Sequence, residues 1–408
     1  MASSSRVGAL FVGACALFAL IGWKYGGSGA SADIYVSADS HSHIRRTLQA
    51  AAAAAKGKRV VLLTGAAGFV GFHTAMKLHA NGEVVLGVDN FNAYYQVSLK
   101  RSRASILKKA HSSATPLHLF EGDVCDDALL KLLLREGHVT NVIHLAAQAG
   151  VRYSLKKPLA YVEANIKCFV TLLEAVNSVN SSIPITYASS SSVYGINKKI
   201  PFQESDRIDS QASLYGATKK ANENIAHVYH HLHGLRLTGL RFFTVYGPYG
   251  RPDMAYFSFT QAILAGQQIV EYRKDDGTEL QRDFTYVSDI VNGIIAAMHL
   301  GAPLEVFNLG NTRPERVSRL ISLLERGLGR HANKTLAPIS AGDVPITYAD
   351  VSHATEQLGY EPKVSLEHGI RQFLQWYSSY YNIPLPAATK NRRGLRPRSD
   401  RAWLRSAR

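Results

Sequence analysis

The chain has 408 residues, of which 46% are hydrophobic and 19% are charged. This composition excludes a disordered protein, and the length suffices for one large α/β domain or two smaller ones. The net charge of +15 includes +7 from residues 390–408, where eight basic residues accompany one acid. Because aromatic residues do not alternate with basic ones, we expect no nucleic-acid partner. We expect the basic tail at 386–408 to be flexible and solvated, with contact to a membrane surface or a partner as the alternative.

An uncharged segment, VGALFVGACALFALIGW, lies at residues 7–23, after a short N-terminal tail. Its length is at the lower limit for a membrane-spanning helix and exceeds the apolar part of most cleaved signal peptides. We therefore expect a transmembrane signal anchor, with cleavage near residues 29–32 as the alternative. One basic residue on each side leaves the orientation open. Residues 24–57 are predicted to be a stem, because the alanine run at 50–55 has no apolar face of its own.

Short apolar runs rich in branched residues alternate with helical patterns over residues 58–249. Such runs suit strands that are buried on both faces, and the alternation predicts an α/β fold with a doubly wound, Rossmann-type parallel sheet. Beyond Gly247 the spacing loosens, so residues 250–385 are predicted to be mainly a smaller substrate-binding part. The predicted strands are 59–63, 83–88, 116–120, 141–145, 183–187 and 237–243, and the predicted helices are 70–80, 99–110, 128–136, 159–177, 215–233, 256–265, 288–299, 317–327 and 366–377.

A glycine-rich segment, TGAAGFVG at 64–71, joins the first predicted strand to the first helix of this sheet. Glycines allow the backbone to turn sharply and to approach a pyrophosphate, and the helix N-terminus supplies free N–H groups. The carboxylate of Asp89, 21 residues after Gly68, follows the second strand. It can accept hydrogen bonds from an adenosine ribose and would repel a 2′-phosphate. The two features together predict a site for NAD rather than NADP.

A tyrosine and a lysine, Tyr215 and Lys219, lie four residues apart where a helix begins, so their side chains share one helix face. A phenol with an ordinary pKa of about 10 is a poor base at neutral pH, and a neighbouring cation would favour the phenolate. Ser190 lies 25 residues earlier, in the serine-rich run at 188–195 that follows a predicted strand. These three side chains are our candidate catalytic group.

Cysteine and histidine residues give no sign of a disulfide framework or a metal site. Cys15 lies in the apolar leader, and Cys125 and Cys168 make only one possible pair. The pattern favours small buried hydrophobic side chains for the cysteines. The 16 histidines show no ligand spacing such as H-E-x-x-H, so we expect no metal ion.

A series of motifs carries a family resemblance over residues 58–380. In chain order they are TGAAGFVG, VDN, EGDV, HLAAQAGVRYS, ASSSSVYG, YGATKK, RFFTVYGPYGRPDM and QRDFTYV. They resemble the extended short-chain dehydrogenase/reductase family and, within it, the UDP-glucuronate 4-epimerases. The resemblance implies an isomerase with tightly bound NAD, which takes up hydride from C4 of the sugar and returns it to the other face. Tyr215, assisted by Ser190, would move the proton of the 4-hydroxyl, and Lys219 would also hold the nicotinamide ribose.

The loop and the resemblance together imply two sets of binding residues. Within them, Asp123 is expected beside the adenine, Thr244 beside the sugar carboxylate, and the arginines at the UDP end. The cofactor set is Gly65, Ala67, Gly68, Phe69, Val70, Gly71, Asp89, Asp123, Ala146, Ala147 and Lys219, and the substrate set is Ser191, Ser192, Thr244, Arg152, Arg251 and Arg282.

The serine-rich segment favours a uronate substrate. A uronate oxidised at C4 is a β-keto acid that loses CO₂ readily, so an epimerase must hold its carboxylate without offering an acid. Decarboxylases that resemble this motif carry Glu where this chain has Ser192. Three alternatives remain open: a 4-epimerase of a neutral UDP-sugar (UDP-glucose/galactose or UDP-xylose/arabinose), a decarboxylase, and a membrane-tethered NAD-binding module without catalysis.

The leader and the resemblance imply a single-pass Golgi membrane protein with a lumenal catalytic part. The glycosylation sequons at Asn180 and Asn333 are compatible with this location. Family members often dimerise through two helices of each subunit, which correspond to the patterns at 159–177 and 215–233 here. A homodimer is therefore a further expectation.

Overall fold

The computed structural model describes residues 41–274, 276–339 and 344–386. The expected signal anchor at 7–23 and almost all of the basic tail at 386–408 lie outside these ranges. Within the described residues, no helix has both the length and the apolar character needed to cross a membrane.

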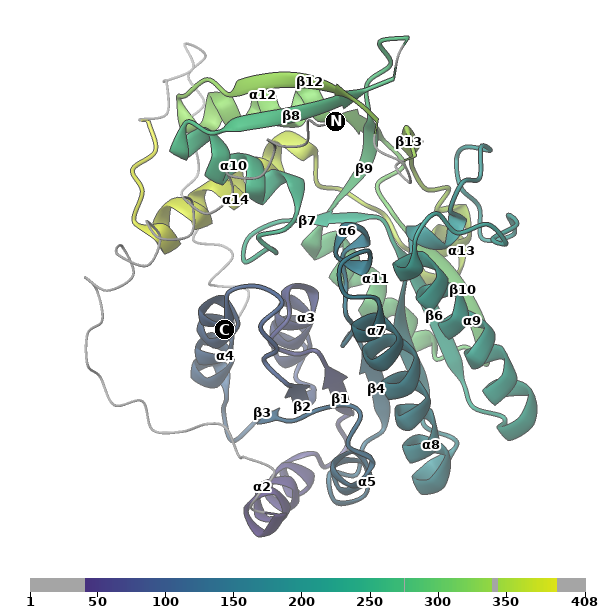
Figure 1. Ribbon diagram of the computed structural model, residues 1–408. Helices are drawn as coiled ribbons and strands as arrows, with labels where there is room; N and C mark the ends of the chain where they lie inside the picture. Colours follow the sequence, from purple (N-terminus) through teal and green to yellow (C-terminus); the bar gives the residue numbers. More distant parts are fainter. Residues whose placement is uncertain (1–40, 275, 340–343, 387–408) are drawn as a thin grey trace, which may run out of the picture. The chain divides into compact units, whose positions relative to one another are not determined.

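A parallel sheet of seven strands carries the glycine loop and the candidate catalytic residues (Figure 1). Every neighbouring pair in the sheet runs parallel. The chain runs outward from β1 through β2 to β3 and then crosses back to β4, beside β1, so the order reverses between β1 and β4. In parallel sheets, ligands bind outside the carboxyl ends of the strands at such a reversal. In spatial order the strands are β10 (Leu304–Leu309), β6 (Leu237–Phe242), β5 (Ile185–Ser190), β4 (Asn141–His144), β1 (Val60–Thr64), β2 (Val84–Asp89) and β3 (Leu117–Glu121).

Both faces of the sheet are covered by helices, which explains the uninterrupted apolar runs of the strands. Along β1, Val61 and Leu63 belong to one buried cluster, while Val60 and Leu62 belong to the other. The prediction of a doubly wound α/β fold is therefore confirmed. One face packs against α3 (Phe69–Ala80), α4 (Val97–Ala110) and α11 (Val287–Leu300), and the other against α2 (His41–Ala54), α5 (Asp127–Glu136), α8 (Cys168–Asn180) and α9 (Leu214–His233).

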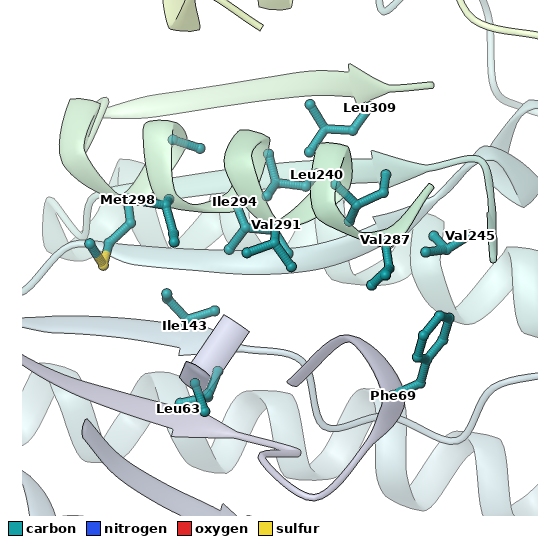
Figure 2. Close-up of a cluster of buried hydrophobic side chains, with 14 of the residues drawn as sticks. Leu63, Phe69, Ile143, Leu240, Val245, Val287, Val291, Ile294, Met298 and Leu309 are labelled. Carbon is teal, nitrogen blue, oxygen red and sulfur yellow. The ribbon is translucent and has the colours of Figure 1, made fainter. Parts of the chain in front are cut away.

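The predicted boundary at residue 250 does not separate the sheet from the substrate-binding part. Helix α11 and strand β10 follow residue 250, yet β10 pairs with β6 and α11 covers the sheet. Figure 2 shows Val291 and Ile294 of α11 over Leu240 of β6, with Ile143 of β4 nearby. The predicted strands end at residue 243, so both the strand at 304–309 and the return of the chain to the sheet were missed.

The predicted stem is partly wrong, because most of its second half forms helix α2 and packs on the sheet domain. Ile44, Leu48 and Ala51 recur at helical spacing and are buried in the same cluster as Leu133 of α5. The helix does have an apolar stripe, formed by these three side chains. The stripe is not evident in the sequence, because a run of alanines places the same small side chain on every face of the helix.

Most of the elements after residue 243 form a smaller layer at the carboxyl ends of the strands (Figure 1). Strand β9 pairs with β7, β11 and β13, and β8 pairs with β12. A third buried cluster joins the helices of this layer. The strands are β7 (Thr244–Tyr246), β8 (Gln268–Arg273), β9 (Gln281–Tyr286), β11 (Pro314–Arg316), β12 (Asn333–Pro338) and β13 (Ile346–Thr347), and the helices are α10 (Ala255–Ala265), α12 (Val317–Leu328) and α14 (Leu366–Tyr381); the short helix α13 (Ser352–Leu358) packs beside α11.

Candidate active site

A cavity of about 1020 Å³ lies where the parallel strands end beneath the smaller layer. This volume is at the upper end for small-molecule sites, which leaves room for a dinucleotide and a second ligand. Of the predicted site residues, Ala67 is the one that does not line the cavity. The lining includes Gly65, Gly68, Phe69, Val70, Gly71, Asp89, Asp123, Ala146, Ala147, Arg152, Ser190, Ser191, Ser192, Tyr215, Lys219, Thr244, Arg251 and Arg282.

The glycine loop between β1 and α3 has the geometry of a phosphate cradle. Gly65 has φ +70°, and a Cβ there would lie 2.8 Å from the amide nitrogen of Ala146. A Cβ on Gly71 would lie 2.0 Å from the carbonyl oxygen of Gly65, so the helix could not approach the loop. Gly68 is the N-cap of α3 and no side chain caps its free N–H groups. Free N–H groups at an uncapped N-terminus suit a pyrophosphate, and the residues present therefore fit NAD.

Ala67 was predicted to contact the cofactor, but its role is internal to the loop. The residue is fully buried, and its amide donates to Asp89 Oδ2 at 3.0 Å. Its carbonyl oxygen accepts a hydrogen bond from the guanidinium of Arg103 at 2.9 Å. Ala67 thus connects the loop to two buried charged side chains.

Asp89 ends β2 and lines the cavity, as predicted for a ribose-binding carboxylate. Its second oxygen accepts from the amide of Phe91 at 2.8 Å, and Lys100 Nζ lies 3.6 Å from the same oxygen. A carboxylate offers about four acceptor positions, so both oxygens can still accept from ribose hydroxyls. Lys100 of α4 is buried in the cavity wall, and the sequence analysis missed it.

Cys125 and Cys168 form a disulfide, which corrects the prediction of two buried thiols. The loop after β3 carries Cys125, and Cys168 is the first residue of α8. Their Cα atoms lie 4.3 Å apart although 43 residues separate them in the chain. Asp123 and the two sulfurs cluster within 4.8 Å, but bonded sulfurs offer no thiolate to a metal ion. The absence of a metal ion remains a prediction.

The predicted catalytic residues come together at the end of β5 and the start of α9. Ser213 caps α9 through a hydrogen bond from the amide of Gly216, which places Tyr215 in the first turn. Burial raises the pKa of Tyr215, while its hydrogen bond with Ser190 and the charge of Arg251 act in the opposite direction. The serine therefore has the predicted contact with the phenol.

Lys219 lies one turn after Tyr215 and is 3% exposed. Its Nζ donates to the carbonyl oxygen of Ala188 in β5 at 2.8 Å. Burial lowers the pKa of Lys219 to about 8, against the opposing charge of Glu223. The paired charges of Arg251 and Asp253 act on the pKa of the Tyr215 phenol in opposite directions, and the effect assigned to Lys219 remains a prediction.

Two buried polar networks hold these catalytic elements in place. Asn165 accepts from the Gln148 amide at 2.8 Å and donates to Thr218 of α9 at 3.0 Å. Glu223 of the same helix accepts from Ser189 at 2.6 Å and from two nitrogens of Arg241 at 2.9 Å. Buried groups of this kind are stable because each charge is paired and hydrogen-bonded. The networks fix the serine loop against α9.

At the substrate end, Arg251 forms two hydrogen bonds with the carboxylate of Asp253. Tyr94 also donates to that carboxylate, at 2.9 Å. Burial alone would raise the pKa of Asp253, but the charge and hydrogen bonds of Arg251 lower it. Arg251 is thus held in an ion pair at the cavity wall, and its contact with UDP remains a prediction.

The other two predicted arginines line the cavity from two different elements. Arg152, on the short helix at 151–154, is exposed, and its guanidinium lies 5.2 Å from the Tyr272 ring. Arg282 of β9 donates to the carbonyl oxygens of Gln281 and Pro345 at 2.9 and 3.2 Å. Both line the cavity, and a guanidinium suits a diphosphate; this role remains a prediction.

Comparisons with known proteins identify the family. The profile described as "GDP-mannose 4,6 dehydratase" matches residues 62–373. UDP-glucuronate 4-epimerase 4 of Arabidopsis thaliana is 50% identical over 344 residues, which are 81% of this chain and 78% of the relative. This chain belongs to the extended short-chain dehydrogenase/reductase family.

Solved structures of this family resemble the chain in fold. The crystal structure of UDP-glucuronic acid 4-epimerase from Bacillus cereus, in complex with UDP-glucuronic acid and NAD, has a TM-score of 0.72 and 34% identity. The alignment covers 79% of this chain and the whole of the Bacillus cereus chain. The crystal structure of UDP-glucose 4-epimerase from Thermotoga maritima with UDP-glucose has a TM-score of 0.69 and 31% identity. The alignment covers 79% of this chain and 99% of that chain.

Several residues that hold the site together are absent from the predicted set. Asp253 lies two residues from Arg251, and that spacing was a usable signal for their pairing. Tyr94 and Asp253 are 159 residues apart, and no local pattern connects them. Glu223 lies one turn after Lys219 on the same helix face, a spacing that could have shown it.

Proposed function

We propose that this chain is an NAD-dependent UDP-glucuronate 4-epimerase, which interconverts UDP-glucuronate and UDP-galacturonate through a 4-keto intermediate. The support comes from curated relatives with about half of their residues identical and from a cavity built for a dinucleotide and a second ligand. When bound, NAD supplies the hydride acceptor and donor for C4 of the sugar.

The residues of this chain supply binding and proton transfer. The Tyr215 phenol takes the proton of the sugar 4-hydroxyl and later returns it, and Ser190 stabilises the phenolate through its hydrogen bond. Lys219 is positioned by Ala188 in the cleft, where its ammonium can donate to ribose hydroxyls of the cofactor. The charge of Arg251 lowers the pKa of the phenol, and the charge of its partner Asp253 acts in the opposite direction.

The observation that carries the uronate assignment is the set of hydroxyls around Tyr215. Ser191, Ser192 and Thr244 line the same cavity, and hydroxyls can hold a carboxylate without acting on C5. Among the described residues at this end, the acid is Asp253, which Arg251 keeps ionised by pairing with it. An ionised and paired carboxylate cannot donate a proton that would assist loss of CO₂.

A substrate comparison tests this assignment. Purified protein is incubated separately with UDP-glucuronate and UDP-glucose, and the products are identified by NMR. We expect UDP-galacturonate from the first and little or no UDP-galactose from the second. Conversion of the neutral sugar alone would indicate a UDP-glucose 4-epimerase, and release of CO₂ or UDP-xylose would indicate a decarboxylase.

We further propose a single-pass Golgi membrane protein with a lumenal catalytic part. The apolar segment at 7–23 supports an anchor. The disulfide supports an oxidising compartment, where such bonds persist. Asn180 and Asn333 of the two sequons are exposed, as glycan attachment requires. Protease protection in microsomes checks the orientation: digestion of the intact catalytic part in sealed vesicles would contradict it.

A homodimer through α9 is a further proposal. Val228 and Leu232, four residues apart on this helix, are 47% and 65% exposed, which is unusual for neighbouring large apolar side chains. Light scattering of the wild type should give twice the mass of one chain. The variant Leu232→Asp should shift the protein to monomers, and an unchanged mass in that variant would contradict this interface.

A further inference from the structure

The disulfide between Cys125 and Cys168 lies in the wall of the cleft, at its adenosine end. Both residues line the cavity together with Asp89 and Asp123. In Rossmann folds the carboxylate at the end of the second strand binds the adenosine ribose. Since Asp89 occupies that position, the disulfide lies beside the adenosine half of a bound dinucleotide.

The bond connects the loop that carries Asp123 to the start of α8. Asp123 Oδ1 accepts from the amide of Cys125 at 2.8 Å and lies 3.8 Å from Cys168 Sγ. Its other oxygen accepts from Asn90 at 2.9 Å. The backbone of Cys125 therefore helps to hold the Asp123 carboxylate. Without the covalent bond, this loop would be held to α8 by non-covalent contacts alone.

The two sulfurs differ in access. Cys168 is 3% exposed, and Cys125 is half-buried. A thiolate reductant attacks the accessible sulfur in line with the S–S bond, so Cys125 is the expected point of attack. Because Cys125 lines the cavity, a dinucleotide bound there would obstruct the approach of a reductant to this sulfur. The negative charge of Asp123 also opposes an incoming thiolate.

We propose that Cys125 and Cys168 form a thiol–disulfide site that is linked to occupancy of the cofactor cleft. The oxidised form holds NAD more tightly than the reduced form, and bound NAD favours the disulfide. The two statements describe one thermodynamic linkage. The factor by which the disulfide raises the affinity for NAD equals the factor by which bound NAD favours the disulfide. On oxidation, the two thiols give two electrons and two protons to the disulfide of an exchange partner, whose S–S bond breaks as the Sγ–Sγ bond forms. A dithiol reverses the step.

Thiol counting tests whether the bond forms. The full chain is isolated from the secretory pathway and denatured without reductant, and free thiols are titrated. We expect one free thiol, that of Cys15, and three after reduction. The control variant Cys15→Ser should give no free thiol before reduction and two free thiols after it. Three free thiols in the unreduced wild type would overturn the proposal.

A redox titration tests the linkage. The full chain is equilibrated with mixtures of reduced and oxidised dithiothreitol, with and without saturating NAD, and the reduced fraction is measured by alkylation and mass spectrometry. We expect NAD to raise the reduced-to-oxidised ratio needed for half reduction about fivefold or more. An unchanged ratio would overturn the proposal. This experiment uses no sugar substrate, so its outcome is independent of the epimerase assignment.

Variants supply the reciprocal measurement. NAD affinity is measured by calorimetry for Cys125→Ser and Cys168→Ser, with Cys15→Ser as the matched control. Both cleft variants should bind NAD more weakly, by the same factor that reduction produces in the wild type, and should not respond to dithiothreitol. Wild-type affinity in both variants would overturn the proposal. If a variant does not fold, the redox titration of the wild type still decides.

Discussion

Arg103 donates a hydrogen bond from its guanidinium to the carbonyl oxygen of Ala67 at 2.9 Å. The same side chain donates to the carbonyl oxygen of Tyr249 at 2.6 Å and is fully buried in α4. Ala67 belongs to the glycine loop, and Tyr249 precedes Arg251 by two residues. A single buried cation therefore holds the cofactor loop and the substrate-end turn in one arrangement.

Arg103→Met should lower the free energy of unfolding by about 3 kcal/mol, because buried carbonyl oxygens lose a charged donor. Urea denaturation measures the change. The matched control is Arg101→Met on the same helix, where the ion pair with Glu121 is partly exposed. Its loss should be about 1 kcal/mol or less. Equal losses in the two variants would mean that Arg103 has no special structural role.

Tyr215→Phe should lower kcat by about three orders of magnitude while NAD stays bound, because the phenyl ring fills the same space but cannot take the proton. Turnover of UDP-glucuronate and the NAD content of the purified protein are measured together. Tyr229→Phe removes a hydroxyl from the same helix, where it bonds to Glu174 away from the cleft, and serves as the control. Substantial activity in Tyr215→Phe would exclude the phenol as the base.

Lys219 should produce a pH-dependent stability difference between the wild type and Lys219→Met. Burial lowers the pKa of Lys219 to about 8, whereas a lysine in the unfolded chain has a pKa of about 10.4. Between these two pKa values the unfolded chain binds more protons than the folded chain. The contribution of this group to the free energy of unfolding therefore rises with pH through that range and is constant below about pH 8.

The free energy of unfolding of the wild type should therefore increase relative to Lys219→Met by about 2 kcal/mol between pH 8 and pH 10. Urea denaturation at several pH values measures it, with Lys220→Met as the neighbouring control. A difference that stays constant with pH would show that the ammonium is not destabilised by its burial.

Asp89→Asn should weaken NAD binding about tenfold or more, because an amide group replaces one of two oxygens that accept backbone N–H groups at 3.0 and 2.8 Å. Calorimetry measures the affinity. Asp126→Asn is the control, since Asp126 caps α5 outside the cavity and an asparagine oxygen can keep accepting from Leu129. Unchanged affinity in Asp89→Asn would remove this carboxylate from the cofactor site.

The family, the sheet and most site residues could be predicted because their signals are local. The glycine loop, the carboxylate at the end of β2 and the Tyr215–Lys219 pair each lie within one strand–turn–helix unit, where spacing alone sets which side chains share a face. The signal anchor, the Golgi location and the dimer remain predictions, since the structural findings do not test them.

The sequence by itself determined most strands and helices of residues 58–249 and which short motifs can bind a phosphate or move a proton, because backbone geometry converts spacing directly into direction. Only the tertiary structure decided that Cys125 meets Cys168, that Tyr94 donates to Asp253, and that β10 returns to the sheet edge. These relationships join residues far apart in the chain, and their partners are chosen by packing, which no local pattern records.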